Sequence, residues 1–457
     1  MENQKVAQNN KISPVDEKLP ISKLIPLGFQ HVFAMYAGAL AVPIIIGNAV
    51  GLSPEDLAFL IAADLFTCGL ATLVQALGIG KYAGIKLPVV LGCSFVAVGP
   101  MVAIGQKPGS GLTTVFGAVI AAGIFLWLIA RLFGKLIKFF PPLVTGIVIT
   151  TVGISLLPVA IENAAGGAKA GAEFGSPTNL LLAGITLVVV LIMNRFFTGF
   201  LQSISILVAL VVGTIIATFM GVADYSEVVH AGWFSIVRPF HFGPPVFDVS
   251  AVISLCLVAI VTTIEAIGVF MGLGQICEKD IDEKDIVRGI RAEGITKIMG
   301  GVMNSFPYAT FSQNVGLVTL SGIKSRYVCV SAGVILAVLG VIPKFAALGT
   351  AIPVSVLGGA TLAMFGTVAV SGIKILSGVD FSKQGNILTI AVSIGVGLGF
   401  KFMPEALAFV PDFLKMYLED GIITASFLAI ILNILFNHKE LSKSAKVEAV
   451  TESVGGH

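Results

Sequence analysis

Apolar runs of about 20 residues recur along almost the whole chain, and a run of that length can cross a membrane as a helix. The composition agrees with this pattern, because 56% of the 457 residues are hydrophobic and only 12% are charged. A soluble domain usually carries about 25% charged residues. The sequence therefore predicts an all-α polytopic membrane protein.

The runs can be placed along the chain to within a few residues. Two of them, at about 85–103 and 307–322, are apolar but broken by Gly, Pro and polar residues. Uninterrupted spans are expected near 24–46, 55–77, 111–131, 139–158, 178–195, 201–220, 248–274, 288–303, 327–345, 348–370, 385–401 and 420–437. Counted together, the runs predict about 14 transmembrane segments.

The basic residues predict how these segments are oriented. Most of the 28 Lys and Arg residues fall on the side of the chain that also holds both ends. The loops at 159–177 and 221–247 on the other side are poor in Lys and Arg. Cytoplasmic loops carry the excess of basic residues. We therefore expect a protein of the cytoplasmic (inner or plasma) membrane, with cytoplasmic tails at 1–23 and 438–457.

The chain also shows signs of internal duplication. The stretch Ala122–Leu126 (AGIFL) matches Ala332–Leu336 (AGVIL), and the two broken segments are each third in a set of seven. A repeat with an odd number of segments enters the membrane in the opposite orientation, a recurring plan of secondary transporters. We expect inverted repeats at 24–220 and 248–437, joined by an outside loop at 221–247.

The broken segment Asn304–Gly322 is the best pointer to a binding site. Backbone that is not helical at membrane depth survives only where it is buried in protein or lines a cavity. Gln313 and Asn314 begin its helical half, and side-chain amides offer donors and acceptors in one plane. That chemistry suits a planar heterocycle whose edge alternates C=O and N–H groups. For Asn314, a helix cap is the alternative.

Glu265 lies midway along an apolar span, in the stretch Val261–Gly268. A charge at that depth costs about 2.5–3.5 kcal/mol, so the side chain should face the protein interior. A buried carboxyl group can also bind and release a proton. We expect Glu265 to accept a hydrogen bond from substrate and to couple transport to protons. The alternative is a carboxylate fixed by amides at a helix end.

Four other residues at membrane positions have open roles. Phe95, in the first broken segment, could stack on a flat ring or only pack. His31 is expected to orient neighbouring helices rather than transfer protons. Glu293 is either a second coupling carboxylate or an interface residue, and for Asp64 a structural role is favoured.

Several classes of function are excluded. The net charge of +2 is too small to indicate nucleic acid as a partner. The cysteines show no paired spacing typical of a disulfide or a zinc site. A membrane-embedded enzyme would need a nucleophile–base pair or metal ligands, and the sequence offers neither. We expect no metal and no cofactor, with a proton as the coupling ion.

The stretch Gln313–Gly322 (QNVGLVTLSG) resembles the signature of the nucleobase–ascorbate transporter family, also called nucleobase:cation symporters. That signature reads Gln/Glu/Pro-Asn-x-Gly-x-x-x-x-Thr followed by Arg, Lys or Gly. The matching positions here are Gln313, Asn314, Gly316, Ser321 and Gly322, with Ser in place of the usual Thr. Other stretches similar to family landmarks are Gln30–Val32, Gly92–Phe95, Thr263–Glu265 and Ser305–Pro307. The similarity covers most of 20–437.

The resemblance implies a fold and a site. The fold would have 14 segments in a core domain and a gate domain, with a short strand and a half-helix in segments 3 and 10. Substrate would bind between them, with Glu265 and Gln313 hydrogen-bonding a purine, Phe95 against its ring and Ser312 completing the site. Supporting roles in binding or coupling would fall to His31, Asn314 and Glu293. Family members commonly form homodimers through the gate domain.

The sequence therefore predicts a proton-coupled symporter that imports purine nucleobases by alternating access. Gln at the start of the signature and Gly at its end resemble the bacterial xanthine and uric acid branch. The alternatives are a permease for uracil or another nucleobase, and an anion transporter of the same architecture. An anion site would favour Arg or Lys beside the half-helices, where the sequence shows none.

Overall fold

The computed structural model describes residues 13–136, 141–311 and 313–454. The chain divides into two compact units, one within Met1–Arg131 and Val159–Ala363 and the other within Leu132–Pro158 and Met364–His457. Every predicted site residue that the structure describes belongs to the first unit.

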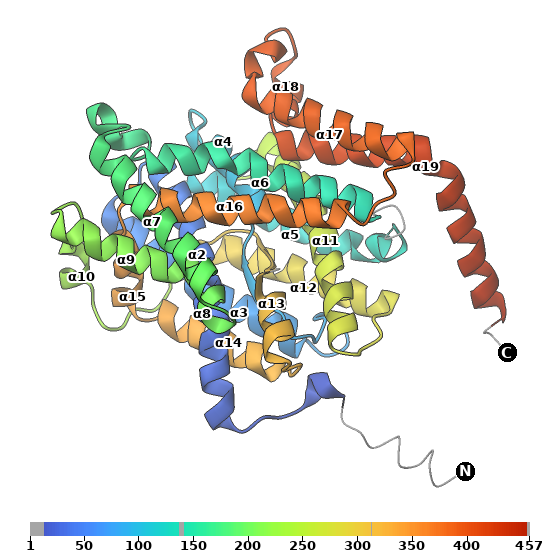
Figure 1. Ribbon diagram of the computed structural model, residues 1–457, viewed down its shortest axis with the longest axis horizontal. Coiled ribbons are helices and arrows are strands. Elements are labelled where there is room, and N and C mark those ends of the chain that lie inside the picture. Colours follow the sequence, from blue (N-terminus) through green and yellow to red (C-terminus); the bar gives the residue numbers. More distant parts are fainter. Residues whose placement is uncertain (1–12, 137–140, 312, 455–457) are drawn as a thin grey trace. The chain divides into compact units, whose positions relative to one another are not determined.

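The first unit contains most of the helices and both strands (Figure 1). Its elements are η1 (Pro14–Asp16), α2 (Ile21–Ala49), α3 (Pro54–Leu77), β1 (Leu91–Cys93), η2 (Phe95–Ala97), α4 (Val98–Gln106), most of α5 (Leu112–Leu136), η4 (Ala168–Glu173), α7 (Pro177–Phe196), α8 (Phe200–Ser203), α9 (Ser205–Phe219), α10 (Ser226–His230), α11 (Val249–Ile276), α12 (Glu283–Val302), β2 (Tyr308–Thr310), α13 (Gln313–Ser321), α14 (Tyr327–Gly340) and α15 (Pro343–Thr350). Parts of both units are formed by α6 (Pro142–Ala164) and α16 (Val354–Leu376). The second unit also holds α17 (Gln384–Phe402), η5 (Pro404–Leu407), α18 (Asp412–Leu418) and α19 (Gly421–Val454).

Among the described residues, eight helices are long and apolar enough to cross a membrane: α2, α3, α5, α6, α7, α11, α16 and α17. The helices α14 and α15 form a ninth candidate, a pair bent by 80°. Shorter apolar helices occur at Phe95–Gln106, Ser205–Phe219 and Gly421–Asn437. The protein is therefore a multi-pass membrane protein, while the count of 14 segments and the two repeats stay predictions.

Two predicted spans have wrong boundaries. The span predicted at 327–345 ends at Gly340, and α15 then occupies part of both predicted spans. The next span begins at Val354 rather than at 348. Proline lacks an N–H group and suits the first turn of a helix, so a run containing it tends to restart as a new helix. Pro343 is the first residue of α15, and Pro353 directly precedes α16.

The two segments predicted to be broken each contain a short strand followed by a half-helix, as expected. The strand β1 leads into η2 and α4, and β2 leads into α13. The strands pair in antiparallel register, with Leu91 opposite Thr310 and Cys93 opposite Tyr308. Two segments that are far apart in the sequence thus meet through their backbones.

Pairs of glycines let the helices around these strands approach closely. A Cβ atom at Gly69 of α3 would lie 2.4 Å from the carbonyl oxygen of Gly333 in α14. A Cβ atom at Gly123 of α5 would lie 2.6 Å from the carbonyl oxygen of Gly294 in α12. Neither place has room for a side chain. Each glycine pair brings a helix that contacts a strand, α3 or α12, against a neighbouring helix.

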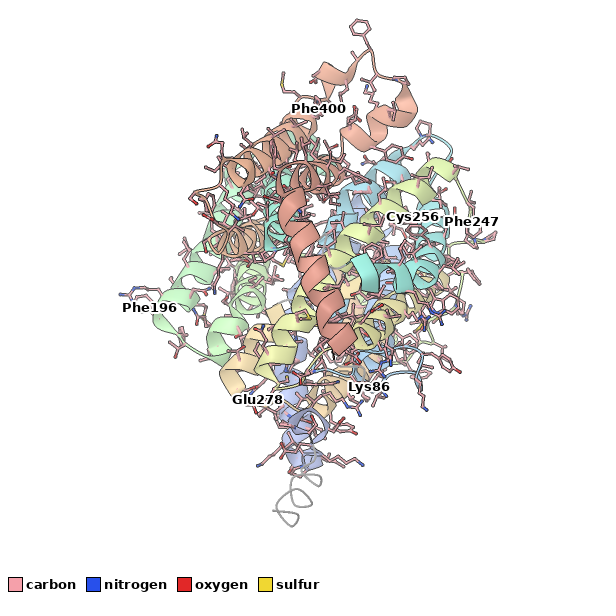
Figure 2. The ribbon with its side chains drawn as sticks, turned by 90° about the vertical axis from the view of Figure 1, so that its right-hand side faces the viewer. Lys86, Phe196, Phe247, Cys256, Glu278 and Phe400 are labelled. Atoms are coloured by element: carbon pink, nitrogen blue, oxygen red, sulfur yellow. The ribbon has the colours of Figure 1, made fainter. Side chains whose placement is uncertain are left out.

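The helix that carries Glu265, α11, begins with a side-chain cap. The carboxylate of Asp248 accepts a hydrogen bond from the Ala251 amide at 2.9 Å, which pairs one of the free N–H groups of the first turn. Figure 2 shows Phe247 and Glu278 at opposite ends of this helix, with Lys86 on the side of Glu278. The ammonium group of Lys279 donates to the Lys86 carbonyl oxygen at 3.4 Å. The start of the first broken segment and the loop after α11, which the predicted orientation puts on the cytoplasmic side, therefore meet.

In the second unit, α17 and α19 pack against each other. A Cβ atom at Gly397 would lie 2.6 Å from the carbonyl oxygen of Gly421. The side-chain amide of Asn437 donates to Asn386 and to Asn433, at 2.9 Å each. Close backbone approach and amide hydrogen bonds are the usual means of joining helices in a membrane.

Candidate functional site

The antiparallel strand pair forms the centre of the candidate site. Backbone hydrogen bonds of 3.0 Å run from Ser94 N to Pro307 O and from Phe311 N to Val90 O. Bonded and non-bonded pairs alternate along an antiparallel ladder. The backbone groups of Leu91 and Tyr308, at the positions between, therefore point away from the partner strand. In surroundings without water each of these groups needs another partner.

Side chains of α3 and α12 supply these partners. The Leu91 amide donates to Thr72 Oγ1 at 3.0 Å, and Cys68 Sγ donates to the Leu91 carbonyl oxygen at 2.7 Å. On the other strand, the ammonium group of Lys297 donates to the Tyr308 carbonyl oxygen at 2.8 Å. Both outer edges of the strand pair are thus held by side chains from a packed helix.

Lys297 is paired with Glu293, one turn earlier on α12. The Lys297 Nζ lies 3.3 Å from Glu293 Oε2, and both side chains are 0% exposed. The other carboxylate oxygen, Oε1, accepts a hydrogen bond of 3.0 Å from the Thr310 hydroxyl. Lys297 was not predicted as a site residue. A Lys four residues after a Glu in an apolar span is the signal that could have found it.

Asp64 of α3 anchors the turn before β2. Its Oδ1 accepts hydrogen bonds from Cys93 Sγ at 2.8 Å, from Ser305 Oγ at 2.5 Å and from the Tyr308 hydroxyl at 2.9 Å. The side chain is completely buried, and Oδ2 has no hydrogen-bond partner among the described residues. These contacts tie α3 to both strands, which favours the structural role expected for Asp64.

Glu265 occupies α11, the helix that contacts both broken segments. This helix contacts η2 and α4 in the first broken segment and β2 and α13 in the second. The Glu265 side chain is half-buried. It makes no hydrogen bond or ion pair with any side chain that the structure describes. The expected contact of Glu265 with substrate stays a prediction.

An aromatic pair lies beside the strands. The rings of Phe95 and Phe311 meet edge to face, with centroids 5.8 Å apart and an interplanar angle of 71°. The Phe311 ring covers Gly92, where a Cβ atom would lie 1.9 Å from it, and approaches Gly38 of α2. Phe311 was not predicted, although an aromatic residue two positions before Gln313 was visible in the sequence.

The side chain of Asn314 contacts the first span. Its amide nitrogen lies 3.1 Å from His31 Nδ1 and 3.2 Å from the His31 carbonyl oxygen. Both residues are buried, and the Asn314 amide oxygen has no hydrogen-bond partner among the described residues. The contact joins the start of α13 to α2, while the orienting role expected for His31 stays a prediction.

The remaining signature residues shape α13. The helix begins at Gln313, whose side chain, like the whole of Ser312, lies outside the described part of the chain. Gly322 follows the helix with a φ of +66°, a conformation that glycine adopts easily. Ser321 Oγ accepts a hydrogen bond from the Ile323 amide at 3.2 Å. Gly316 is exposed, and a Cβ atom added there would meet nothing within 4 Å.

The charged groups near the predicted cytoplasmic ends form ion pairs. Lys324, in the loop after α13, hydrogen-bonds the carboxylate of Glu278, just beyond α11. This bond holds the pKa of Glu278 below its usual value.

In the part of the chain that the structure describes, no group of three His, Cys, Asp or Glu side chains could hold a metal ion.

Comparisons of the sequence with known proteins agree on one family. The family model of the Permease family (Xan_ur_permease) matches residues 22–406. The nucleobase transporter PlUacP of Paenibacillus larvae is 50% identical over 91% of this chain and 95% of its own. The xanthine permease of Bacillus subtilis is 48% identical over 93% of this chain and 96% of its own. The uric acid permease PucJ of the same species is 47% identical over 92% and 93%.

A solved structure shares the fold. The transmembrane domain of a cyanobacterial bicarbonate transporter, BicA, aligns with a TM-score of 0.60 at 19% identity. The alignment covers 92% of this chain and all of that domain. The two chains therefore have the same overall fold.

Proposed function

Because the chain belongs to the Permease family, we propose that it is a symporter that imports purine nucleobases, foremost xanthine and uric acid, together with protons. A permease is a transporter and not an enzyme. The relatives named for xanthine and for uric acid support this substrate class. The observation that carries the proposal is the half-buried carboxylate of Glu265, on the helix that contacts both half-helices.

The proposed substrate suits the chemistry of the predicted site residues. A purine such as xanthine presents alternating N–H and C=O groups, so it needs acceptors and donors in one plane. Glu265 would accept from an N–H group, and Gln313 would pair with a neighbouring N–H and C=O. Phe95 would lie against the ring, and Ser312 would complete the site. Supporting roles would fall to His31, Asn314 and Glu293.

Transport would follow from a change in the charge of Glu265. In its protonated form it would bind substrate on the outside, and release of the proton inside would weaken the binding. A core domain carrying the site would move against a gate domain between these two states. Such coupling requires that the ligand binds the two states with different affinities, because a ligand that binds both states equally does not shift the equilibrium between them.

The proposed architecture has two inverted repeats of seven segments, at 24–220 and 248–437. Reciprocal glycine contacts support it: Gly69 meets Gly333, and Gly294 meets Gly123. In the proposed repeats, α3 and α12 are the second segments and α5 and α14 the fourth, so both contacts join a second segment to a fourth. Two equivalent contacts are expected of a duplicated chain.

We also propose that both tails, 1–23 and 438–457, lie in the cytoplasm and that 221–247 is an outside loop. The contact of Lys279 with the Lys86 carbonyl oxygen supports this orientation, because both belong to segments predicted to be inside. The membrane would be the cytoplasmic membrane. The working form would be a homodimer joined through the gate domains, as the family resemblance implies.

The proposal can be tested by uptake of labelled xanthine and uric acid into proteoliposomes in sodium-free buffer. An inward proton gradient should drive accumulation, and Glu265→Gln should abolish accumulation while leaving the protein folded. Glu283→Gln, an exposed Glu on the neighbouring α12, is the matched control and should accumulate like wild type. Proton-driven accumulation that survives in Glu265→Gln would refute the coupling role.

The competing substrates are tested in the same assay. Unlabelled uracil should compete poorly against labelled xanthine, and uric acid should compete well. Bicarbonate tests the anion alternative that the shared fold raises. Lys297 is a buried cation beside β2, but Glu293 balances its charge, so this lysine does not favour an anion site.

A further inference from the structure

The strand β2 has one edge that is not paired with another strand. Its inner edge bonds to β1, while the Tyr308 carbonyl group points outward. The corresponding edge of β1 is closed by the neutral groups of Thr72 and Cys68. The edge of β2 is closed by an ammonium group, that of Lys297, at 2.8 Å. The outer edge of β1 is thus bonded by neutral side chains, whereas the outer edge of β2 is bonded by a charged one.

The two supports occupy matching places on their helices. Cys68, Gly69 and Thr72 on α3 follow the same spacing as Glu293, Gly294 and Lys297 on α12. In each set the glycine forms the close helix contact, and its neighbours hold a strand. The charged pair on α12 therefore stands where α3 has a thiol and a hydroxyl.

A buried ammonium group needs a counter-charge, and Glu293 provides it at 3.3 Å. Glu293 also accepts from the Thr310 hydroxyl, so the pair holds β2 at two alternate residues. The half-helix α13 begins three residues after Thr310. Any shift of β2 would move the start of α13, where Gln313 lies.

We propose that Lys297 is a positioning residue of the transport site and that Glu293 is its counter-charge rather than a group that exchanges protons. Other titratable groups face this pair from packed elements. Glu265 on α11 is close enough for Glu293 to repel its charge, and Tyr308 and Asp64 lie beyond the strand. In this proposal the Lys297 ammonium group balances the charge of Glu293, which leaves Glu265 as the group that changes its charge during transport. This inference rests on the proposed function.

The deciding variant is the double replacement Glu293→Gln and Lys297→Met, which removes both charges and keeps similar volumes. A neutral pair of this kind is often tolerated where a single buried charge is not. In proteoliposomes we expect the double variant to accumulate xanthine along a proton gradient, with a KM above that of wild type but below that of Lys297→Met, because no buried charge is left unpaired. A double variant that binds xanthine but no longer responds to the gradient, or that cannot be recovered folded, overturns the proposal.

The single variant Lys297→Met tests the positioning role. It leaves Glu293 without its cation beside Glu265, so two carboxyl groups then compete for protons. We expect KM to rise about tenfold or more and the alkaline limb of the uptake profile to move to higher pH. Lys284→Met, the same change at an exposed site of α12, is the control and should do neither. A wild-type KM and pH profile in Lys297→Met would contradict the proposal.

A readout that does not depend on transport separates this inference from the proposed function. Amide hydrogen exchange over 304–322 should be faster in Lys297→Met than in Lys284→Met, and intermediate in the double variant. If wild type carries no purine, the proposed function fails, and exchange still decides whether Lys297 holds β2. Equal exchange in all variants would show that it does not.

Discussion

The tightest contact of the site predicts the effect of one added methyl group. Gly92 of β1 lies under the ring of Phe311, and a Cβ atom there would be 1.9 Å from Cε2, 2.5 Å from Cδ2 and 2.9 Å from Cζ. Ordinary contact begins at 3.4 Å, so the ring would have to move by about 1.5 Å, the difference between 3.4 Å and 1.9 Å. Gly38 and Phe95 stand on other sides of the ring and limit where it can go.

Overpacking of this kind costs about 1–3 kcal/mol. If the substrate-bound state carries up to that much more cost than the free state, Gly92→Ala should raise the KM for xanthine by up to about 150-fold. The same variant should lower the midpoint of thermal unfolding of the purified protein, because the strand pair or the ring must shift in the free state as well. Both quantities can be measured on one detergent-purified preparation that is then reconstituted.

Two further variants make this prediction specific. Gly272→Ala adds the same methyl group on α11, where no atom lies within 4 Å, and should leave both quantities unchanged. Gly92→Ala combined with Phe311→Leu removes part of the obstructing ring and should recover thermal stability. A Gly92→Ala protein with wild-type stability and KM would show that the Phe311 ring does not rest on Gly92.

The other predictions concern the contacts that hold the strands and half-helices. Asp64→Ala removes the carboxylate oxygen that accepts from Cys93, Ser305 and Tyr308 and should lower the unfolding midpoint strongly, whereas Asp64→Asn should lower it less; equal midpoints would contradict the network. Asn314→Ala frees α13 from His31 and should raise the KM for xanthine by up to about tenfold without loss of folded protein, as uptake kinetics would show. Gly69→Leu cannot fit against Gly333 and should abolish folded protein on size-exclusion chromatography.

Much of the site could be predicted because its signals are local in the sequence. Polar and Gly/Pro-rich residues inside an apolar run identified both broken segments, and each contains a strand and a half-helix. A carboxylate in the middle of an apolar span identified Glu265, since such a group is too costly to face lipid. The error at 327–370 arose because hydropathy does not register where prolines restart a helix within a continuous apolar run.

What could not be predicted depends on pairing between distant segments. The register that places Leu91 opposite Thr310 is set by two strands of three residues, too short for any pattern to fix. Without that register, nothing in the sequence indicates that the Tyr308 carbonyl group faces α12 or that Phe311 lies over Gly92. The role of Lys297 was hidden for the same reason.

The position of Lys297 bears on how one half of a duplicated site can come to differ from the other. Thr72 and Lys297 follow equivalent glycines by the same spacing, and each closes the outer edge of a strand. A hydroxyl group needs no counter-charge, whereas an ammonium group does, so the change to Lys on α12 is compatible with folding only if position 293 carries a carboxylate. On this reasoning Glu293 and Lys297 form one unit. Replacing either alone should then be more harmful than replacing both, while Thr72→Val on α3 should act independently of them, because its partners on β1 are not shared.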